Sequence, residues 1–502
     1  MASKHLSANG KLSAFCVVFV AAAVGFLSAE RACTAAEGCY EATWASLGKY
    51  PIPEWLKDAK FGIYTHWGVY SVPACGENGT WYPHNMYREG TRQYKYHVEN
   101  YGPPTEFGYK DFIPMFKAEK FDAEEWADLF KKAGAQFAGP VAEHHDGFAM
   151  WESKWTKWDA AEMGPKRDVV GELEKAIKGK GMRFVTAFHH AQNWYHFPVY
   201  DEQFDCSKRE YSGLYGPIHP KGGKPNEEFT KIWKGKLIEV VDKYDPDFIW
   251  FDYQLDKIQE DQTREFLAYY YNKAGERGKE VVVTYKDHDL PPGVGLVDLE
   301  LGQMDKLTYH MWITDTSVDD QGAWSYVQDA GFKSADTLID NLVDRVSKNG
   351  FLLLNVGPKP DGTIPEPARE ALLEMGRWLK VNGEAIYGTR PWIVAEEGPT
   401  KIERGGAFSE QKGAVRYTGE DIRFTAKGGS LYAVCLDWPG EEVTIKSLRR
   451  LHDSEIKSVR MLGVDGDLEW SFGKEGLTVK VPDKKPCDYA YAFKVVRDGR
   501  GN

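Results

Sequence analysis

The sequence predicts an α/β protein that consists of an irregular (β/α)₈ TIM-like barrel followed by a C-terminal β-sandwich domain. Eight short runs rich in β-branched and aromatic residues occur between residues 61 and 357. Helical patterns separate most of these runs, which is typical of a parallel sheet buried on both faces. Beyond residue 387 the pattern changes to strict alternation, as in antiparallel sandwiches. We therefore expect a barrel over residues 45–387 and a β-sandwich over residues 388–502.

The barrel strands are expected at residues 61–67, 137–143, 183–190, 248–253, 281–286, 296–301, 309–314 and 351–357. Helices are expected at 122–135, 168–181, 226–244 and 334–350, where apolar residues recur at helical spacing and acidic residues or glycines mark the ends. The link from residue 286 to 296 is too short for a full helix, so the barrel should be irregular. An open doubly wound sheet is the alternative, but it would carry a glycine-rich phosphate turn after the first strand, and "THWGVYS" is not one.

The N-terminus resembles a signal peptide. Lys4 and Lys11 precede an apolar stretch over residues 13–29, and small residues before Glu30 fit cleavage after residue 29, with a second site as late as residue 35. The stretch is shorter than a spanning helix, so we expect no membrane partner and a periplasmic or extracellular location, or a lysosomal one in a eukaryote. Asn78 begins a glycosylation sequon, "NGT", which has meaning only in a eukaryotic host.

Charge and cysteine usage exclude several classes of function. A net charge of −12 argues against nucleic acid as a partner, because nothing would neutralise its phosphates. The seven cysteines are scattered without a CxxC motif, so neither a disulfide scaffold nor a zinc module is expected. One or two disulfide bridges, and a homo-oligomer, are compatible with the sequence.

Polar and aromatic side chains gather at the predicted strand ends. Active sites of such barrels lie at the C-terminal ends of the strands. Those ends carry His66, His144, His145, His189, Trp250, Asp252, Lys286 and Glu300. A functional cleft is therefore expected at this end of the barrel.

Three chemistries could use this cleft. Metal hydrolysis favours a His-x-His pair on one strand, whereas His144 and His145 are adjacent and should point to opposite sides, so no metal or other cofactor is expected. Serine catalysis would need a nucleophile at an elbow motif, and none is present. Glycoside hydrolysis needs two carboxylates, which Asp252 and Glu300 could provide, while histidines bind hydroxyls and tryptophans stack on the sugar.

The same region resembles the α-L-fucosidases of glycoside hydrolase family 29. The resemblance lies in "KFGIYTHWGVYSVPA", "HHDGFAMW", "IWFD", "WITDTSVDDQGAWSY", "VSKNGFLLLNVGPKPDGTIP" and "VNGEAIYGTRPW", which run in order from about residue 55 to 392. It implies a retaining exo-fucosidase (type EC 3.2.1.51) that acts on a fucosylated glycan, with an irregular barrel and a C-terminal β-sandwich. It also implies that Asp252 is the nucleophile and that His66, His144, His145, Trp250 and Trp81 bind the sugar.

The resemblance fixes the acid/base less firmly, because the family carries it on a variable segment. Glu300 is the acidic strand-end residue downstream of Asp252, and Asp298 is its competitor two residues deeper in the strand.

Four positions depart from the family pattern. Thr80 stands where a glutamate is common, Tyr253 where glycine is common, Glu143 where lysine is common, and Lys286 where some members carry arginine. Three alternatives stay open: an exo-glycosidase for L-galactose, one for sulfated fucose, with Lys286 and Glu143 tuning a substituent pocket, or an inactive carbohydrate-binding protein. The C-terminal domain could bind carbohydrate or simply stabilise the barrel.

Overall fold

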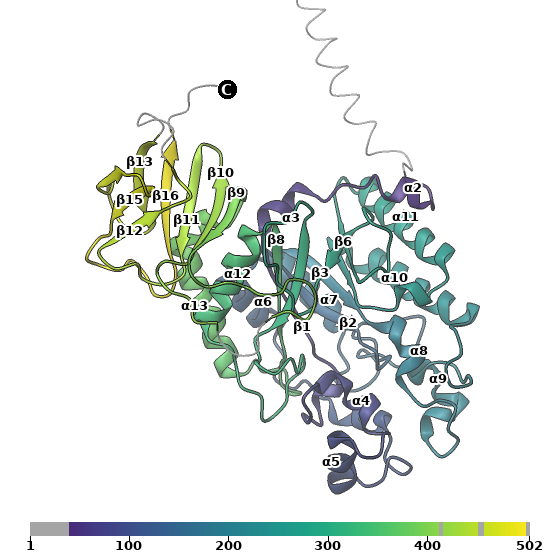
Figure 1. The fold of residues 1–502 in the computed structure, drawn as a ribbon. Coiled ribbons are helices and arrows are strands. Elements are labelled where there is room, and N and C mark those ends of the chain that lie inside the picture. The colour runs from purple at the N-terminus through teal and green to yellow at the C-terminus, as the bar shows by residue number, and fades with distance from the viewer. Residues whose placement is uncertain (1–39, 411–414, 450–455, 498–502) are drawn as a thin grey trace, which may run out of the picture.

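The structure is a computed structural model that describes residues 40–410, 415–449 and 456–497. Eight parallel strands form a closed barrel in chain order, with β8 pairing back to β1 (Figure 1). The strands are β1 (Phe61–Thr65), β2 (Phe137–Glu143), β3 (Arg183–Phe188), β4 (Phe248–Phe251), β5 (Val282–Lys286), β6 (Leu296–Asp298), β7 (Trp312–Ser317) and β8 (Gly350–Val356). The predicted fold is confirmed, and the open doubly wound sheet is excluded.

Side chains alternate between the inside and the outside of the barrel. On β3, Val185 and Ala187 belong to the cluster that fills the interior, whereas Phe184 packs outward. On β8, Phe351 and Leu353 fill the interior in the same way. Both faces are apolar because helices cover the outside, which explains the continuous apolar runs of the sequence.

Helices follow most of the strands. The longer ones are α5 (Arg92–Tyr101), α6 (Ala123–Lys132), α7 (Val169–Gly179), α10 (Glu227–Tyr244), α11 (Glu260–Glu276), α12 (Ala335–Ser347) and α13 (Glu366–Asn382). The short ones are α2 (Trp44–Leu47), α3 (Glu54–Ala59), α4 (Tyr82–Asn85), α8 (Asn193–His196) and α9 (Ser212–Tyr215). Side chains such as Asp122, which accepts hydrogen bonds from the Glu124 and Glu125 amides, cap their N-termini.

The barrel is irregular around β6. Residues 287–311 are all described and contain no helix, so neither β5 nor β6 has a helical crossover. The seventh strand begins three residues later than the sequence predicts, because aromatic residues at 309–312 imitate a strand. Tyr309 is instead 93% exposed in the preceding loop. The true strand ends in the polar residues Asp315, Thr316 and Ser317, which are buried and whose polarity conceals the strand.

The C-terminal domain contains two antiparallel sheets over a shared core. One sheet has the order β13-β16-β11-β10-β9 and the other β12-β15-β14. Their bounds are β9 (Arg390–Glu397), β10 (Ile422–Lys427), β11 (Ser430–Cys435), β12 (Glu442–Ile445), β13 (Ile456–Met461), β14 (Trp470–Phe472), β15 (Leu477–Lys480) and β16 (Tyr491–Arg497). Phe424, Val443 and Phe493 belong to one apolar cluster between the sheets, as expected of a β-sandwich.

The sandwich packs against the barrel through α12, which contacts β9 and β10 (Figure 1). Four charged side chains join the two domains there. Arg423 Nε lies 2.7 Å from Asp344 and Lys348 Nζ lies 2.8 Å from both Asp344 and Glu396. Each cation therefore has a carboxylate partner within the interface.

Three further expectations concern the termini and the cysteines. In the described part of the chain, no helix has both the length and the apolar character to cross a membrane. The expected signal peptide lies outside the described residues, as do Cys33 and Cys39. Cys75, Cys206, Cys435 and Cys487 are free thiols.

Candidate active site

A cavity of about 380 Å³ opens at the C-terminal ends of the barrel strands. All nine residues that the sequence predicts for the site line it, and so does Asp298. The complete lining is His66, Asn78, Thr80, Trp81, His144, His145, His189, Trp250, Asp252, Tyr253, Lys286, Asp287, Asp298, Glu300, Asp315, Trp324, Ala407 and Phe408. The closed barrel explains this convergence, because every strand delivers its last residues to the same mouth.

Three side chains lie within 3.4 Å of the carboxylate of Asp252, which directly follows β4. His189 Nδ1 donates to its Oδ2 at 2.9 Å, and His145 Nε2 lies 3.3 Å from the same oxygen. Lys286 Nζ lies 3.4 Å from Oδ1. Burial alone would raise the pKa of Asp252, but Lys286 and His189 outweigh it and hold this pKa well below its usual range. Asp252 is therefore a carboxylate at any physiological pH.

Glu300 lies two residues beyond β6 and contacts the same lysine. Lys286 Nζ donates to Glu300 Oε2 at 2.5 Å. Burial raises the pKa of Glu300 to about 7, against the opposing effect of Lys286. Glu300 can therefore both hold and release a proton near neutral pH.

Asp298, the competitor for Glu300, is tied into the barrel wall. Its Oδ2 accepts from Trp250 Nε1 at 3.1 Å, and its Oδ1 accepts from the amide of Asp315 at 3.1 Å. Its side chain is fully inaccessible, whereas that of Glu300 is 20% exposed. Burial also raises the pKa of Asp298 well above its usual range. The geometry therefore favours Glu300 for proton exchange with a bound molecule.

The separation of Asp252 and Glu300 bears on stereochemistry. One ammonium nitrogen touches both, so the two oxygen atoms lie no farther apart than the sum of its 3.4 and 2.5 Å contacts. Retaining glycosidases place their carboxyls roughly 5–5.5 Å apart, and inverting ones roughly 6.5–9.5 Å. This upper bound lies below the inverting range and therefore favours a retaining pair.

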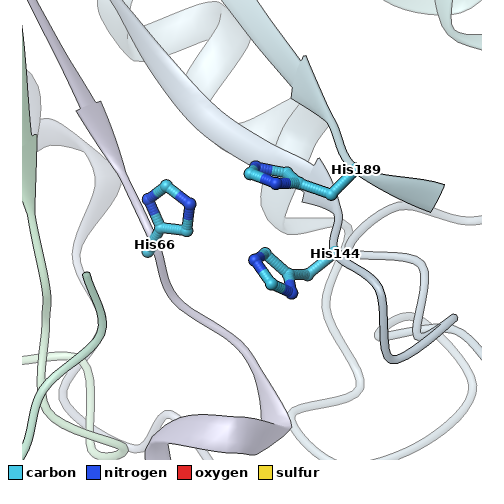
Figure 2. A group of neighbouring side chains, drawn as sticks. All are labelled: His66, His144 and His189. Atoms are coloured by element: carbon cyan, nitrogen blue, oxygen red, sulfur yellow. The ribbon is translucent and has the colours of Figure 1, made fainter. Parts of the chain in front are cut away.

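His66, His144 and His189 point toward one another across the pocket (Figure 2). Burial lowers the pKa of His66 and of His144 well below the usual range, so both rings are neutral. The amide nitrogen of Asn355 already donates to Ser317 and Trp324, so its Oδ1 accepts from His66 Nδ1 at 2.8 Å. His66 Nε2 is then an acceptor, whereas His189 donates from Nδ1 to Asp252 and its Nε2 has no hydrogen-bond partner among the described residues.

The expectation that His144 and His145 face opposite sides is wrong, since both line the pocket. β2 ends at Glu143, so strand alternation no longer applies to the two histidines. The chain turns there and Gly147 adopts a φ of 77°. His145 Nδ1 donates to the His189 carbonyl at 2.9 Å, and burial lowers the pKa of His145 to about 3.

Among the residues that the structure describes, two groups of side chains could hold a metal ion: His66 with His144 and His189, and His145 with His189 and Asp252. Within each group the donor atoms lie within 4.8 Å of one another. Within the second group, His189 Nδ1 and His145 Nε2 lie 2.9 Å and 3.3 Å from Asp252 Oδ2. The same converging side chains can bind sugar hydroxyls.

Glu143 does not reach the pocket, contrary to the expected role in a substituent pocket. It points outward to α10, where Lys236 Nζ donates to its Oε1 at 2.7 Å, and both side chains are buried. His190 likewise turns away and stacks on Trp233. Of the positions that depart from the family pattern, Thr80, Tyr253 and Lys286 line the cavity.

Several lining residues escape prediction from the sequence. Asp315 is hidden by the misplaced seventh strand, although its position at a strand end would have identified it. Trp324 contacts His66 with ring centroids 5.4 Å apart, from the loop after β7. Ala407 and Phe408 come from the loop between β9 and β10 of the C-terminal domain, and no local signal in the sequence indicates them.

Comparison with known proteins agrees with this architecture. Residues 27–384 match the family model "Alpha-L-fucosidase", and residues 415–496 match "Alpha-L-fucosidase C-terminal domain". The chain is 33% identical to human tissue α-L-fucosidase over 472 residues, which are 91% of each chain. It is 32% identical to the rat tissue α-L-fucosidase over 475 residues, which are 89% of each chain. It superposes with a TM-score of 0.73 on the Thermotoga maritima α-fucosidase in complex with fucose, at 31% identity, over 91% of this chain and 100% of that one. The chain therefore belongs to the α-L-fucosidase family and is a glycoside hydrolase.

Proposed function

We propose that this protein is a retaining exo-α-L-fucosidase in which Asp252 is the nucleophile and Glu300 the acid/base. The observation that carries the proposal is the shared contact of Lys286 with both carboxylates, which keeps them closer together than an inverting pair. A complex of the Thermotoga maritima enzyme with a mechanism-based inhibitor, at 31% identity, supports it.

The first step is attack of Asp252 on the anomeric carbon. The carboxylate is ionised and oriented by His189, so it needs no general base. Protonated Glu300 donates to the departing glycosidic oxygen as the C–O bond breaks. In the second step Glu300 removes a proton from water, which attacks the anomeric carbon and releases fucose with retained configuration.

The histidines explain how the ring is held. His66 presents a neutral acceptor nitrogen, and His189 Nε2 has no hydrogen-bond partner among the described residues, so sugar hydroxyls can pair with both. Trp81 and Trp250 offer apolar faces for the methyl side of fucose. The cavity of about 380 Å³ is at the lower end of small-ligand pockets, roughly 300–1,000 Å³, which favours a single terminal sugar.

The surroundings of Lys286 make sulfated fucose the weaker alternative. Its ammonium lies within 3.9 Å of carboxylate oxygens of Asp252, Asp298, Glu300 and Asp315. A cation already balanced by these groups offers little attraction to a sulfate.

Hydrolysis of 4-nitrophenyl α-L-fucoside, compared with the α-L-galactoside and a sulfated fucoside, tests the proposal. We expect the unsubstituted fucoside to have the highest kcat/KM and Asp252→Asn to lower kcat by roughly 10⁴-fold or more with an unchanged unfolding transition. Proton NMR of the first product should show the α anomer. Release of the β anomer, or near wild-type rates for Asp252→Asn, would contradict the mechanism. No release from any substrate would favour a carbohydrate-binding protein.

Export is also part of the proposal. It is supported by the lysines and the apolar stretch of residues 4–29 and by the small residues that follow. N-terminal sequencing of the secreted protein should give a start at residue 30 or 36.

A further inference from the structure

Phe408 is an exposed aromatic side chain at the mouth of the active-site cavity. It lines the cavity together with Asp252 and Glu300, and 65% of its surface is accessible. It comes from none of the barrel strands but from the loop between β9 and β10 of the C-terminal domain. An exposed apolar ring beside a carbohydrate site calls for an explanation, because burial of the ring would be favourable.

Backbone hydrogen bonds hold the segment that carries Phe408 against Glu300 and Leu301, which follow β6. The Phe408 amide donates to the Glu300 carbonyl at 2.7 Å, and the Glu410 amide donates to the Leu301 carbonyl at 2.8 Å. The Glu410 carboxylate is largely buried and pairs with Lys333 at 2.7 Å. The backbone of Phe408 is therefore held beside Glu300.

The backbone of Phe408 adopts a φ of 53°, in the left-handed region that bulky residues seldom enter. Such strain persists where surrounding contacts impose it, and it gathers at ligand sites. Trp324, another aromatic residue of the cavity lining, has a φ of 62°. Both rings therefore reach the cavity from a strained backbone conformation. Glycine at either position would relieve that strain.

A second cavity, of about 390 Å³, lies on the other side of Phe408. Phe408 lines both cavities, and Leu301, which directly follows Glu300, lines the second one. Its wall mixes aromatic and polar side chains, among them Phe332, Asp320, Asn341 and Tyr417. This mixture suits a sugar, which has apolar faces and hydroxyl edges.

We propose that Phe408 is the stacking platform for the sugar that departs from fucose, and that the second cavity receives the following sugar of the same glycan. The inference rests on the proposed function. The acid/base protonates the glycosidic oxygen, so the leaving group must extend from the fucose on the side of Glu300, where Phe408 and the second cavity lie. The natural substrate is therefore a fucosylated oligosaccharide rather than a fucoside of a small alcohol.

A comparison of leaving groups tests this. The first substrate is α-L-fucosyl fluoride, whose leaving group is a single ion. The second is a disaccharide of fucose and one leaving sugar, and the third is a trisaccharide of fucose and two leaving sugars. For Phe408→Ala we expect the ratio of kcat/KM for the disaccharide to that for the fluoride to fall by about tenfold. Phe408→Trp should retain the ratio. The wild type should favour the trisaccharide over the disaccharide.

Phe408→Gly supplies a second variant that relieves the positive φ, so it should fold at least as well and still lose the preference. Tyr309→Ala removes an exposed aromatic ring outside both cavities and should leave the ratio unchanged. An equal loss on all substrates, or an unchanged ratio in both Phe408→Ala and Phe408→Gly, would overturn the inference while leaving the proposed function intact. Failure of the wild type to hydrolyse even the fluoride would instead overturn the proposed function.

Discussion

The ammonium of Lys286 lies 2.5 Å from Glu300 and so forms an ion pair with the proposed acid/base of the reaction. The same ammonium contacts Asp252 at 3.4 Å and lies 4.8 Å from the centre of the Trp250 ring. Carboxylates raise the pKa of this lysine well above its usual range despite its burial. Lys286 thus keeps its charge throughout the cycle, while Glu300 alternates between a paired carboxylate and a protonated acid.

Lys286 should set the pH dependence of the nucleophile. Among the neighbours that lower the pKa of Asp252, Lys286 has the largest effect. Lys286→Met should therefore raise this pKa, move the acid limb of kcat/KM to higher pH, and lower the maximal rate by about 10²-fold. Lys286→Arg preserves the charge and should keep the acid limb in place. A Met variant with an unshifted limb would show that His189 alone maintains the ionised state.

Glu300 should set the alkaline limb. Its pKa is raised to about 7, and it is the protonated form that donates to the leaving oxygen. Below this pKa the acid is present, and above it kcat/KM should fall by about tenfold for each pH unit. Glu300→Gln cannot ionise, so its residual activity toward an aryl fucoside should show no alkaline limb near pH 7. A limb that persists in this variant would assign it to another group.

External nucleophiles should separate Glu300 from Asp298. Glu300→Ala leaves a fucosyl-enzyme that water attacks slowly, because general base catalysis typically contributes about 10²–10⁴-fold. Azide needs no base and should restore turnover of an activated aryl fucoside. Asp298→Asn is the matched variant: it disturbs the hydrogen bonds to Trp250 and the Asp315 amide, and azide should not rescue it. Rescue of the Asp298 variant alone would exchange the two assignments.

The interface between the domains should depend on Arg423. Its buried guanidinium neutralises Asp344 on α12. Arg423→Ala leaves that carboxylate with one partner fewer and should cost about 3–5 kcal/mol in chemical denaturation. Arg460→Ala breaks an exposed pair with Asp467 and should change the unfolding free energy by less than about 1 kcal/mol. Equal effects of both variants would show that the interface charges contribute little.

The barrel is predictable because its strands are buried on both faces and separated by amphipathic helices. The strand ends are predictable for the same reason, so the order of strands and helices along the chain suffices to place His66, Asp252 and Glu300 at one mouth. The seventh strand is harder to place because its buried polar residues, of which Asp315 lines the site, lack the hydropathy of a strand. Asp315, a residue of the site, thus interrupts the apolar pattern by which the strand would be recognised.

Tertiary contacts that join distant segments could not be predicted. Glu143 resembles a site residue because of its neighbours in the sequence, yet its partner Lys236 lies 93 residues away on α10 and draws it outward. Phe408 enters the cavity because hydrogen bonds to Glu300 and Leu301 hold its segment, and these contacts span more than 100 residues. Neither contact produces a hydrophobic periodicity that could be recognised in the sequence.

The position of Asn78 makes the choice of expression host matter. Asn78 lines the cavity, and its side-chain oxygen accepts a hydrogen bond from the Thr80 hydroxyl, the other polar member of its sequon. An N-linked glycan on this asparagine would stand in the mouth through which fucose must pass. In protein secreted by a eukaryotic cell that modifies Asn78, the glycan would block access to the active-site cavity. The same chain made in a bacterium would keep the cavity open.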